Sequence, residues 1–364
     1  MPNIDTNIIF SKLQDDESRE LFQHRYKYYQ DRDEEHLWDM LSTSRKCTLL
    51  RRKGKPLVDF WYAHEEGLLT KNEVLLYGAG LNAYYACQFA DRYNINVKCI
   101  CDSNVAKHNA LVCDHVVVAP EQMLAEYPDV PIIITPVLPG SKKEILAYLV
   151  AKGVSDDKIF LYYPFNSPEK EEQYFSPSFL TPQPNEVYVD AGCWDGETIL
   201  DFYKFANRKY KKIYGFEPAP ECFERTQKCI EVAAIKNVIM NMQGLWDKKE
   251  KLNFDMAGIW QGGSHISAGG THSIDTIALD EAINPNDKVT FIKMDIEGAE
   301  LKALQGAKNT IMRDLPRLAI CIYHKPEDII TVPEYILSIS SKYVFYIRHH
   351  SNCFNETVLY AIPK

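Results

Sequence analysis

The sequence lacks long hydrophobic runs and an excess of basic residues. None of its apolar runs approaches the ~18 residues of a membrane-spanning helix, and those present, such as residues 318–323, have the length of buried strands. Lys and Arg total 41 against 50 Asp and Glu, which gives a net charge of −9. Because proteins that bind nucleic acid through phosphate contacts usually carry a basic excess, we expect no membrane insertion and no nucleic-acid partner.

The ten cysteines also lack the paired Cys-x-x-Cys spacing of zinc sites, and we expect them to be reduced. Residues 1–16 show no basic segment followed by an apolar one, so no secretory signal is expected and the predicted location is the cytoplasm. What the chain does have is apolar material, 46% of its 364 residues, enough to fill the cores of about two domains.

The first 70 residues are charged and aromatic. Leu21, Arg25 and Tyr28 follow one another at spacings of four and three, which predicts amphipathic helices over this N-terminal extension. Such helices can serve as a packing element or lid, or they can contact a glycan or pair two copies of the chain. A homo-oligomer therefore remains open.

Two α/β domains are expected beyond this extension. Residues 71–165 alternate strands and helices, which predicts a small Rossmann-like parallel sheet. Five prolines lie between positions 164 and 184, so residues 166–185 are expected to be a linker without buried elements. Residues 186–364 predict a second doubly wound sheet. Its strands are expected at 187–189, 212–216, 238–242, 291–294 and 318–323, followed by a hairpin at 343–347 and 357–362.

A glycine turn follows the first strand of the second domain, at residues 190–198. A dinucleotide site would have G-x-G-x-x-G, whereas Gly192 and Gly196 are four residues apart and two acids line the turn. Carboxylates are poor neighbours for a diphosphate but suit a cationic ammonium or sulfonium group, which favours S-adenosylmethionine over NAD. The candidate cofactor-binding residues of the turn are Asp190, Gly192, Trp194, Asp195 and Gly196.

A second acid supports this interpretation. Glu217 ends the next strand, 27 residues after Asp190, where a carboxylate can accept hydrogen bonds from both hydroxyls of a ribose. Pro218 then ends the strand. Leu245 and Asp295 are further candidates for the cofactor site.

Acids and a histidine follow the fourth and fifth strands of this domain. Asp295 ends the fourth strand, at the edge where open α/β sheets bind ligands, and Glu297 and Glu300 follow it at a helix start. His324 follows the fifth strand and is a candidate general base. We therefore predict His324 and Asp295 as catalytic residues.

These residues carry a resemblance to a known family. The segments 190–198, 215–218, 293–300 and 323–326 together resemble FkbM-type methyltransferases, whose signature is the run Lys-Met-Asp-Ile-Glu-Gly-Ala-Glu at 293–300. The resemblance covers roughly residues 186–364. It implies the class I S-adenosylmethionine-dependent fold, a seven-stranded sheet with an antiparallel final strand, and O-methylation of a sugar, glycan or related small metabolite.

Three alternatives stay open. The signature requires no metal, but some sugar methyltransferases use one, and Asp295, Glu297 and Glu300 would then be its ligands. Residues 78–83 read G-x-G-x-x-A, with Asp102 22 residues beyond the second glycine, so the first domain could serve an NAD-dependent nucleotide-sugar oxidoreductase or epimerase. The chain could also be a non-catalytic nucleotide-binding protein.

Overall fold

The computed structural model describes residues 6–44, 49–52, 55–58, 60–65, 67–69, 72–136, 139–162, 172–175, 178–255, 265–266, 272–351 and 354–364. Within these ranges, no helix combines the length and the apolar character needed to cross a bilayer. Eight cysteines lie in the same ranges, and all eight are free thiols.

The chain divides into two compact units, which are described separately. One comprises Met1–Ser44, Glu169–His350 and Phe354–Lys364, and the other comprises Arg45–Pro168 and Ser351–Cys353. The N-terminal extension expected over residues 1–70 is therefore shared between the two units.

The unit built from Arg45–Pro168 contains the predicted parallel α/β sheet. Its order is β5-β6-β4-β3-β7-β8, with only β5 antiparallel to its neighbour among the described strands. Taken along the chain, the parallel strands follow the 3-2-1-4-5 order of doubly wound folds. The strands are β3 Glu73–Tyr77, β4 Asn96–Cys101, β5 Leu111–Val112, β6 His115–Val118, β7 Ile132–Ile134 and β8 Ile159–Leu161; the helices are α5 Leu81–Arg92, α6 Pro120–Glu126 and α7 Pro139–Ala151, with 3-10 turns at Val105–Lys107 and Asp156–Lys158.

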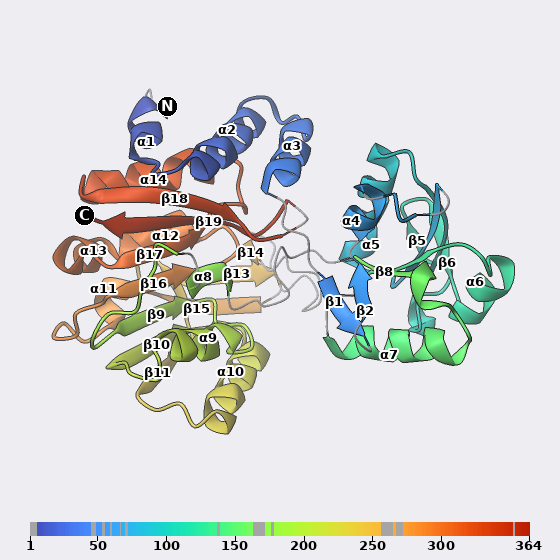
Figure 1. The fold of residues 1–364 in the computed structure, drawn as a ribbon. Helices are drawn as coiled ribbons and strands as arrows, with labels where there is room; N and C mark the ends of the chain where they lie inside the picture. Colours follow the sequence, from blue (N-terminus) through green and yellow to red (C-terminus); the bar gives the residue numbers. More distant parts are fainter. Residues whose placement is uncertain are drawn as a thin grey trace. The chain divides into compact units, whose positions relative to one another are not determined.

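The other unit contains a seven-stranded sheet in the order β11-β10-β9-β16-β17-β19-β18 (Figure 1). β19 pairs antiparallel with both its neighbours, whereas the remaining pairs are parallel. The antiparallel final strand and the terminal hairpin are confirmed. The strands are β9 Val187–Ala191, β10 Lys212–Phe216, β11 Val238–Asn241, β16 Phe291–Met294, β17 Arg317–Cys321, β18 Tyr343–His349 and β19 Thr357–Pro363.

Helices flank this sheet, with α9 and α10 near its β11 edge and α14 near its β18 edge (Figure 1). Gly196 allows the left-handed turn from which α9 starts, and Pro220 occupies the first position of α10, where no backbone donor is needed. The aromatic rings of Tyr188, Phe202 and Phe291 pack between sheet and helices. The helices are α9 Glu197–Phe205, α10 Pro220–Val232, α11 Leu279–Ala282, α12 Glu300–Gly306, α13 Lys308–Asp314 and α14 Asp328–Ile339.

A small second sheet was not predicted from the sequence. It lies in the chain between β11 and β16, in the order β12-β15-β13-β14. Its strands are β12 Gly244–Trp246, β13 Lys251–Asp255, β14 His265–Ile266 and β15 His272–Ala278. Two of them have only two or three residues, too few for the alternation of apolar and polar residues to be recognised.

The N-terminal helices α1 Thr6–Lys12, α2 Asp16–Asp31 and α3 Glu35–Ser44 belong to the same unit. Leu13 forms a bridge with Phe345 of β18, and the Ile347 backbone N–H donates to the Ser18 hydroxyl at 2.9 Å. α2 thus covers the edge strand of the sheet with the face that carries the buried Leu21. These helices are a packing element of the unit.

Two expectations about local structure are wrong. The helical extension gives way to an antiparallel hairpin, β1 Leu49–Arg52 with β2 Lys55–Val58, before the short helix α4 Phe60–Glu65. Pro56 disfavours a helix there because it lacks a backbone donor. The segment 166–185 does contain a buried element, α8 Glu172–Phe175, whose Tyr174 and Phe175 are buried. Of the other linker residues, 166–171 and 176–177 lie outside the described ranges, whereas 178–185 are described and include the buried Leu180.

Candidate active site

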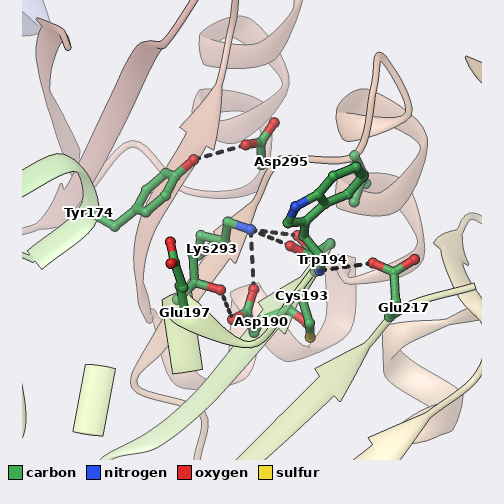
Figure 2. A network of polar contacts seen from close by, with 12 residues as sticks. Tyr174, Asp190, Cys193, Trp194, Glu197, Glu217, Lys293 and Asp295 are labelled. Carbon is green, nitrogen blue, oxygen red and sulfur yellow. Dashed lines mark hydrogen bonds and ion pairs between the residues drawn. The ribbon is translucent and has the colours of Figure 1, made fainter. Parts of the chain in front are cut away.

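The candidate residues converge at the ends of β9, β10, β16 and β17. These strands are parallel neighbours, so their carboxyl ends meet at one edge of the sheet, where ligands of open α/β folds bind. The four ends carry the glycine turn after β9, Glu217 after β10, Asp295 after β16 and His324 after β17. Sequence positions about 100 residues apart, such as Asp190 and Asp295, are thereby brought close together (Figure 2).

Asp190 lies beneath the glycine turn and not at its surface. Its side chain is fully buried, accepts a hydrogen bond from the Thr198 hydroxyl at 2.5 Å and lies 3.2 Å from the ammonium of Lys293. A carboxylate so enclosed acts on a ligand through the turn that it supports.

Lys293 is a residue of the site to which the sequence analysis gave no role. Its ammonium donates to the backbone carbonyls of Ala191 and Gly192, at 3.2 and 2.6 Å, in addition to its ion pair with Asp190 (Figure 2). It thus holds the start of the glycine turn. A signal was available, because a lysine within an apolar strand covered on both faces needs an acidic or carbonyl partner.

The glycines of the turn are required by geometry. Gly192 has φ +81°, and a Cβ there would lie 2.0 Å from the carbonyl oxygen of Asp295. Gly196 has φ +86°, and its Cβ would lie 2.9 Å from Cβ of Cys229. The turn after β9 is therefore packed directly against the end of β16 and against α10, and a larger residue at either position would displace it.

Glu217 organises the ligand side of the turn. Its two carboxylate oxygens accept hydrogen bonds from the backbone N–H groups of Trp194 and Ala219, each at 3.0 Å. Burial raises the pKa of Glu217, and these two hydrogen bonds lower it only in part. The Trp194 ring remains 43% exposed and lies under the guanidinium of Arg225.

The remaining cofactor candidates are Asp195 and Leu245. Asp195 accepts a hydrogen bond from the Glu197 backbone N–H at 3.1 Å, at the start of α9. Leu245 is buried on β12 of the small sheet, where it pairs with Ile277. The neighbouring Gly244 lies close to Pro218, the residue after Glu217.

The residues around the turn fit S-adenosylmethionine. Each oxygen of Glu217 keeps a lone pair after accepting its backbone hydrogen bond, which suits the two hydroxyls of a ribose. The exposed Trp194 ring offers an apolar surface beside it, and Asp195 adds negative charge for a cationic group. The site would hold the cofactor through Glu217, Trp194 and the backbone of the turn.

Asp295 stands at the centre of the second half of the site. Its two oxygens accept hydrogen bonds from the buried hydroxyls of Tyr174 and Tyr323, at 3.0 and 3.1 Å. Burial alone would raise the pKa of Asp295, but Lys293 and His324 lower it below its usual value. Sequence analysis missed Tyr174 because it lies in the expected linker, where no pattern connects it with β16.

His324 is enclosed by carboxylates. Its Nδ1 lies 3.0 Å from Oε1 of Glu300, and its Nε2 lies 3.5 Å from Asp295 and 3.4 Å from Glu297. Burial opposes protonation, but the charges of Glu300 and Asp295 and the polar contacts with Glu297 and Glu300 raise the His324 pKa well above its usual value. One ligand atom each from Asp295, Glu300 and His324 could together hold a metal ion.

Asp102, the acid that follows the glycine motif of the other unit, accepts hydrogen bonds from its own loop. Asp102 accepts hydrogen bonds from the backbone N–H groups of Ala79 and Asn104, both at 2.8 Å, and pairs with Lys107 at 2.9 Å. A Cβ on Gly78 would lie 2.6 Å from the Thr135 hydroxyl. Asp102 thus supports the backbone of its own loop, and its pairing with Lys107 neutralises the charge of the carboxylate.

Comparison with known proteins covers the glycine turn and the acidic centre. Residues 190–345 match the family model described as methyltransferase FkbM domain. This match begins at Asp190 and includes every candidate site residue predicted from the sequence.

Two individual proteins are similar to this chain. Over 129 residues it is 31% identical to the hexuronic acid methyltransferase AglP of Haloferax volcanii; the match covers 35% of this chain and 54% of AglP, so the chain spans about half the length of that relative. The crystal structure of an FkbM methyltransferase from Methylobacillus flagellatus KT matches 81% of this chain and 91% of its own, with a TM-score of 0.50 and 18% identity. The second likeness shows that the fold is shared.

Proposed function

We propose that this chain, which through residues 190–345 belongs to the FkbM methyltransferase family, transfers a methyl group from S-adenosylmethionine to a hydroxyl of a sugar, glycan or related small metabolite. Methyl transfer follows from the family. The cofactor, the oxygen acceptor and the catalytic roles of Asp295 and His324 are the proposal.

One observation carries it: the glycine turn and the acidic centre are packed directly against each other. The Asp295 backbone N–H donates to the Ala191 carbonyl at 3.1 Å, and the space at the Gly192 α-carbon is closed by the Asp295 carbonyl. A cofactor bound at the turn and an acceptor held at Asp295 would therefore be neighbours. Catalysis of methyl transfer depends mainly on such positioning of the two reactants.

The chain's own residues would handle the acceptor. S-adenosylmethionine, when bound, supplies an electrophilic methyl group, whose carbon–sulfur electron pair goes to sulfur as the new carbon–oxygen bond forms. Asp295, held by Tyr174 and Tyr323, orients the acceptor hydroxyl. The proton of that hydroxyl passes to the ionised Asp295 carboxylate, because a sugar hydroxyl is a very weak acid and needs a base. The raised pKa of His324 keeps its imidazole protonated, so His324 would act by holding Asp295 in place.

A sugar is the acceptor class that the comparisons favour. AglP is named as a hexuronic acid methyltransferase, and its similarity to this chain covers 129 residues. The net charge of −9 agrees with a small-molecule or glycan acceptor better than with a nucleic acid.

The test is calorimetric titration of the whole chain with S-adenosylhomocysteine and, separately, with NAD⁺. Saturable binding of S-adenosylhomocysteine is expected, followed by transfer of labelled methyl groups to members of a panel of hexuronic acids, hexoses and nucleotide-sugars. Binding of NAD⁺ without S-adenosylhomocysteine would contradict the proposal and assign the activity to the unit with the Gly78 loop.

A further inference from the structure

We infer that Asp295, Glu300 and His324 form a binding site for one divalent cation beside the glycine turn. One ligand atom of each residue lies within 4.8 Å of the ligand atoms of the other two. The catalytic role of the cation rests on the proposed function, but its binding does not. It also changes the sequence-based ligand set, in which Glu297 stood in place of His324.

The buried imidazole is the observation that an acidic cluster alone would not provide. The His324 side chain is only 9% exposed, and in the described structure neither ring nitrogen makes a hydrogen bond. Oε2 of the fully buried Glu300 has none either. Buried polar atoms without hydrogen bonds are costly and rare, and a bound ion is one of the few arrangements that satisfies several of them at once.

The separations suit ligands of a single ion. His324 Nδ1 lies 3.0 Å from Glu300 Oε1, and Nε2 lies 3.5 Å from Asp295 Oδ1. Ligand atoms at right angles around a cation with bonds of roughly 2.1 Å are about 3 Å apart. A single ion would take only one of the two imidazole nitrogens, together with one oxygen each from Asp295 and Glu300, and such a set of three atoms lies within 4.8 Å.

The ligands are held by neighbouring groups. Tyr174 and Tyr323 donate to the two oxygens of Asp295, and the Ile296 backbone N–H donates to Oε1 of Glu300 at 2.9 Å. Such outer contacts fix carboxylate orientation and are a regular feature of metal sites. Each carboxylate oxygen retains a lone pair for a cation.

The local charge also favours a cation. Asp295, Glu297 and Glu300 all lie within 3.5 Å of the same imidazole. Lys293 pairs with Asp190 and its charge also acts on Asp295, but the ammonium of Lys325 donates to the Gly298 carbonyl. Two carboxylates and one imidazole suit Mn²⁺ or a similar divalent ion, and such an ion would lower the pKa of an acceptor hydroxyl bound beside it.

The test is titration of the metal-free whole chain with Mn²⁺. The electron paramagnetic resonance signal of free Mn²⁺ measures how much of the added ion stays unbound. One Mn²⁺ per chain is expected for the wild type, with a Kd at least tenfold higher in Glu300→Gln and His324→Gln. Glu281→Gln, at an exposed position of α11, is the matched control and should leave the Kd unchanged. If Glu300→Gln loses the fold by circular dichroism, His324→Gln alone decides.

A protonated imidazole bridging the same carboxylates would give a different result. In that case the wild type shows no saturable Mn²⁺ binding, or binds it equally in all four proteins, and the cation site is overturned. S-adenosylhomocysteine is titrated into the same samples with a chelator present. If the chain binds S-adenosylhomocysteine but not Mn²⁺, the proposed function stands and the cation site is overturned. If it binds Mn²⁺ but not S-adenosylhomocysteine, the cation site is supported and the proposed function is contradicted.

Discussion

Lys293 and Asp190 face each other across the two central strands of the sheet, with their charged groups 3.2 Å apart and both side chains buried. The pair lies directly under the glycine turn, two of whose carbonyls also accept from Lys293. Neither residue needs to touch a ligand to matter for binding. The ion pair sets the position of the glycine-turn backbone, which would contact the ligand.

Lys293→Met should weaken both the fold and the cofactor site. Removing one partner of a buried ion pair leaves an uncompensated charge, which typically costs about 3–5 kcal/mol of unfolding free energy. The carbonyls of Ala191 and Gly192 lose their donor as well, so S-adenosylhomocysteine affinity should fall by at least about tenfold. Denaturant unfolding and calorimetric titration measure the two effects.

The double variant Asp190→Asn/Lys293→Met separates the cost of an unpaired buried charge from the loss of the other contacts of Lys293. Asparagine still accepts from the Thr198 hydroxyl but leaves no buried charge, so a substantial part of the lost stability should return. If the double variant is as unstable as the sum of the two single variants, the ion pair is not the reason for the loss.

Glu217→Gln should reduce cofactor affinity with little effect on stability. Burial raises the pKa of Glu217, so its ionised form is less favourable in the folded protein than in the unfolded chain, and glutamine removes that cost. Glutamine accepts only one of the two backbone hydrogen bonds, so the net change in unfolding free energy should stay within about 1 kcal/mol. S-adenosylhomocysteine affinity should fall by about tenfold or more.

The pH dependence gives a second check on Glu217. The pKa of Glu217 is higher in the folded protein than in the unfolded chain. Glu217 therefore destabilises the fold at pH values above its folded-state pKa and has no such effect below its unfolded-state pKa. The wild type should thus gain stability relative to Glu217→Gln as pH falls from 7 towards 4. Glu221→Gln, exposed in the first turn of α10, is the control. A difference that grows with falling pH in the control as well would contradict the assignment to Glu217.

Most of the C-terminal sheet could be predicted from the sequence. β10 and β16 have the predicted bounds, because their apolar runs are strongly patterned and end at an acid. The small sheet β12–β15 could not, because β12 and β14 have only three and two residues and β12 pairs with β15 about 30 residues further along the chain. The hairpin at 49–58 was missed because the charged and aromatic composition of the first 70 residues favoured helices.

The site was predictable in part for the same reason. Asp190, Glu217 and Asp295 could be predicted to converge because each ends a strand of one parallel sheet. Two features depend on packing that no local sequence pattern contains. Asp190 is buried beside Lys293, and Tyr174 reaches Asp295 from a segment rich in proline.

Asp15→Asn should show a stability difference that depends on pH. Asp15 caps α2 by accepting from the Ser18 backbone at 2.9 Å, and pairs with Arg348 of β18 at 2.6 Å. Burial acts to raise its pKa, but the hydrogen bonds from Arg348 and Ser18 lower it to about 2.

The folded-state pKa of Asp15 is thus below its unfolded value, so its contribution is present above pH ~4 and is lost as pH falls towards 2. The Asp15 side chain is about one-third exposed and is partly screened by solvent, so the contribution should be about 1 kcal/mol or less. Unfolding of the wild type and Asp15→Asn should differ at pH 7 and converge near pH 2. Asp16→Asn, at the fully exposed neighbouring position, should show a smaller difference at pH 7.

Phe175→Ala tests whether the segment after residue 171 is part of the C-terminal core. The Phe175 ring is buried and lies 5.6 Å from the ring of Tyr188 and 5.5 Å from that of Phe291. Truncating a buried phenylalanine leaves a cavity and typically costs about 3–5 kcal/mol, whereas the exposed Met312→Ala should cost far less. Because Phe175 follows Tyr174, its loss should also loosen the hydrogen bond to Asp295 and slow methyl transfer. A Phe175→Ala protein as stable as the wild type would mean that this segment is the free linker that its prolines suggest.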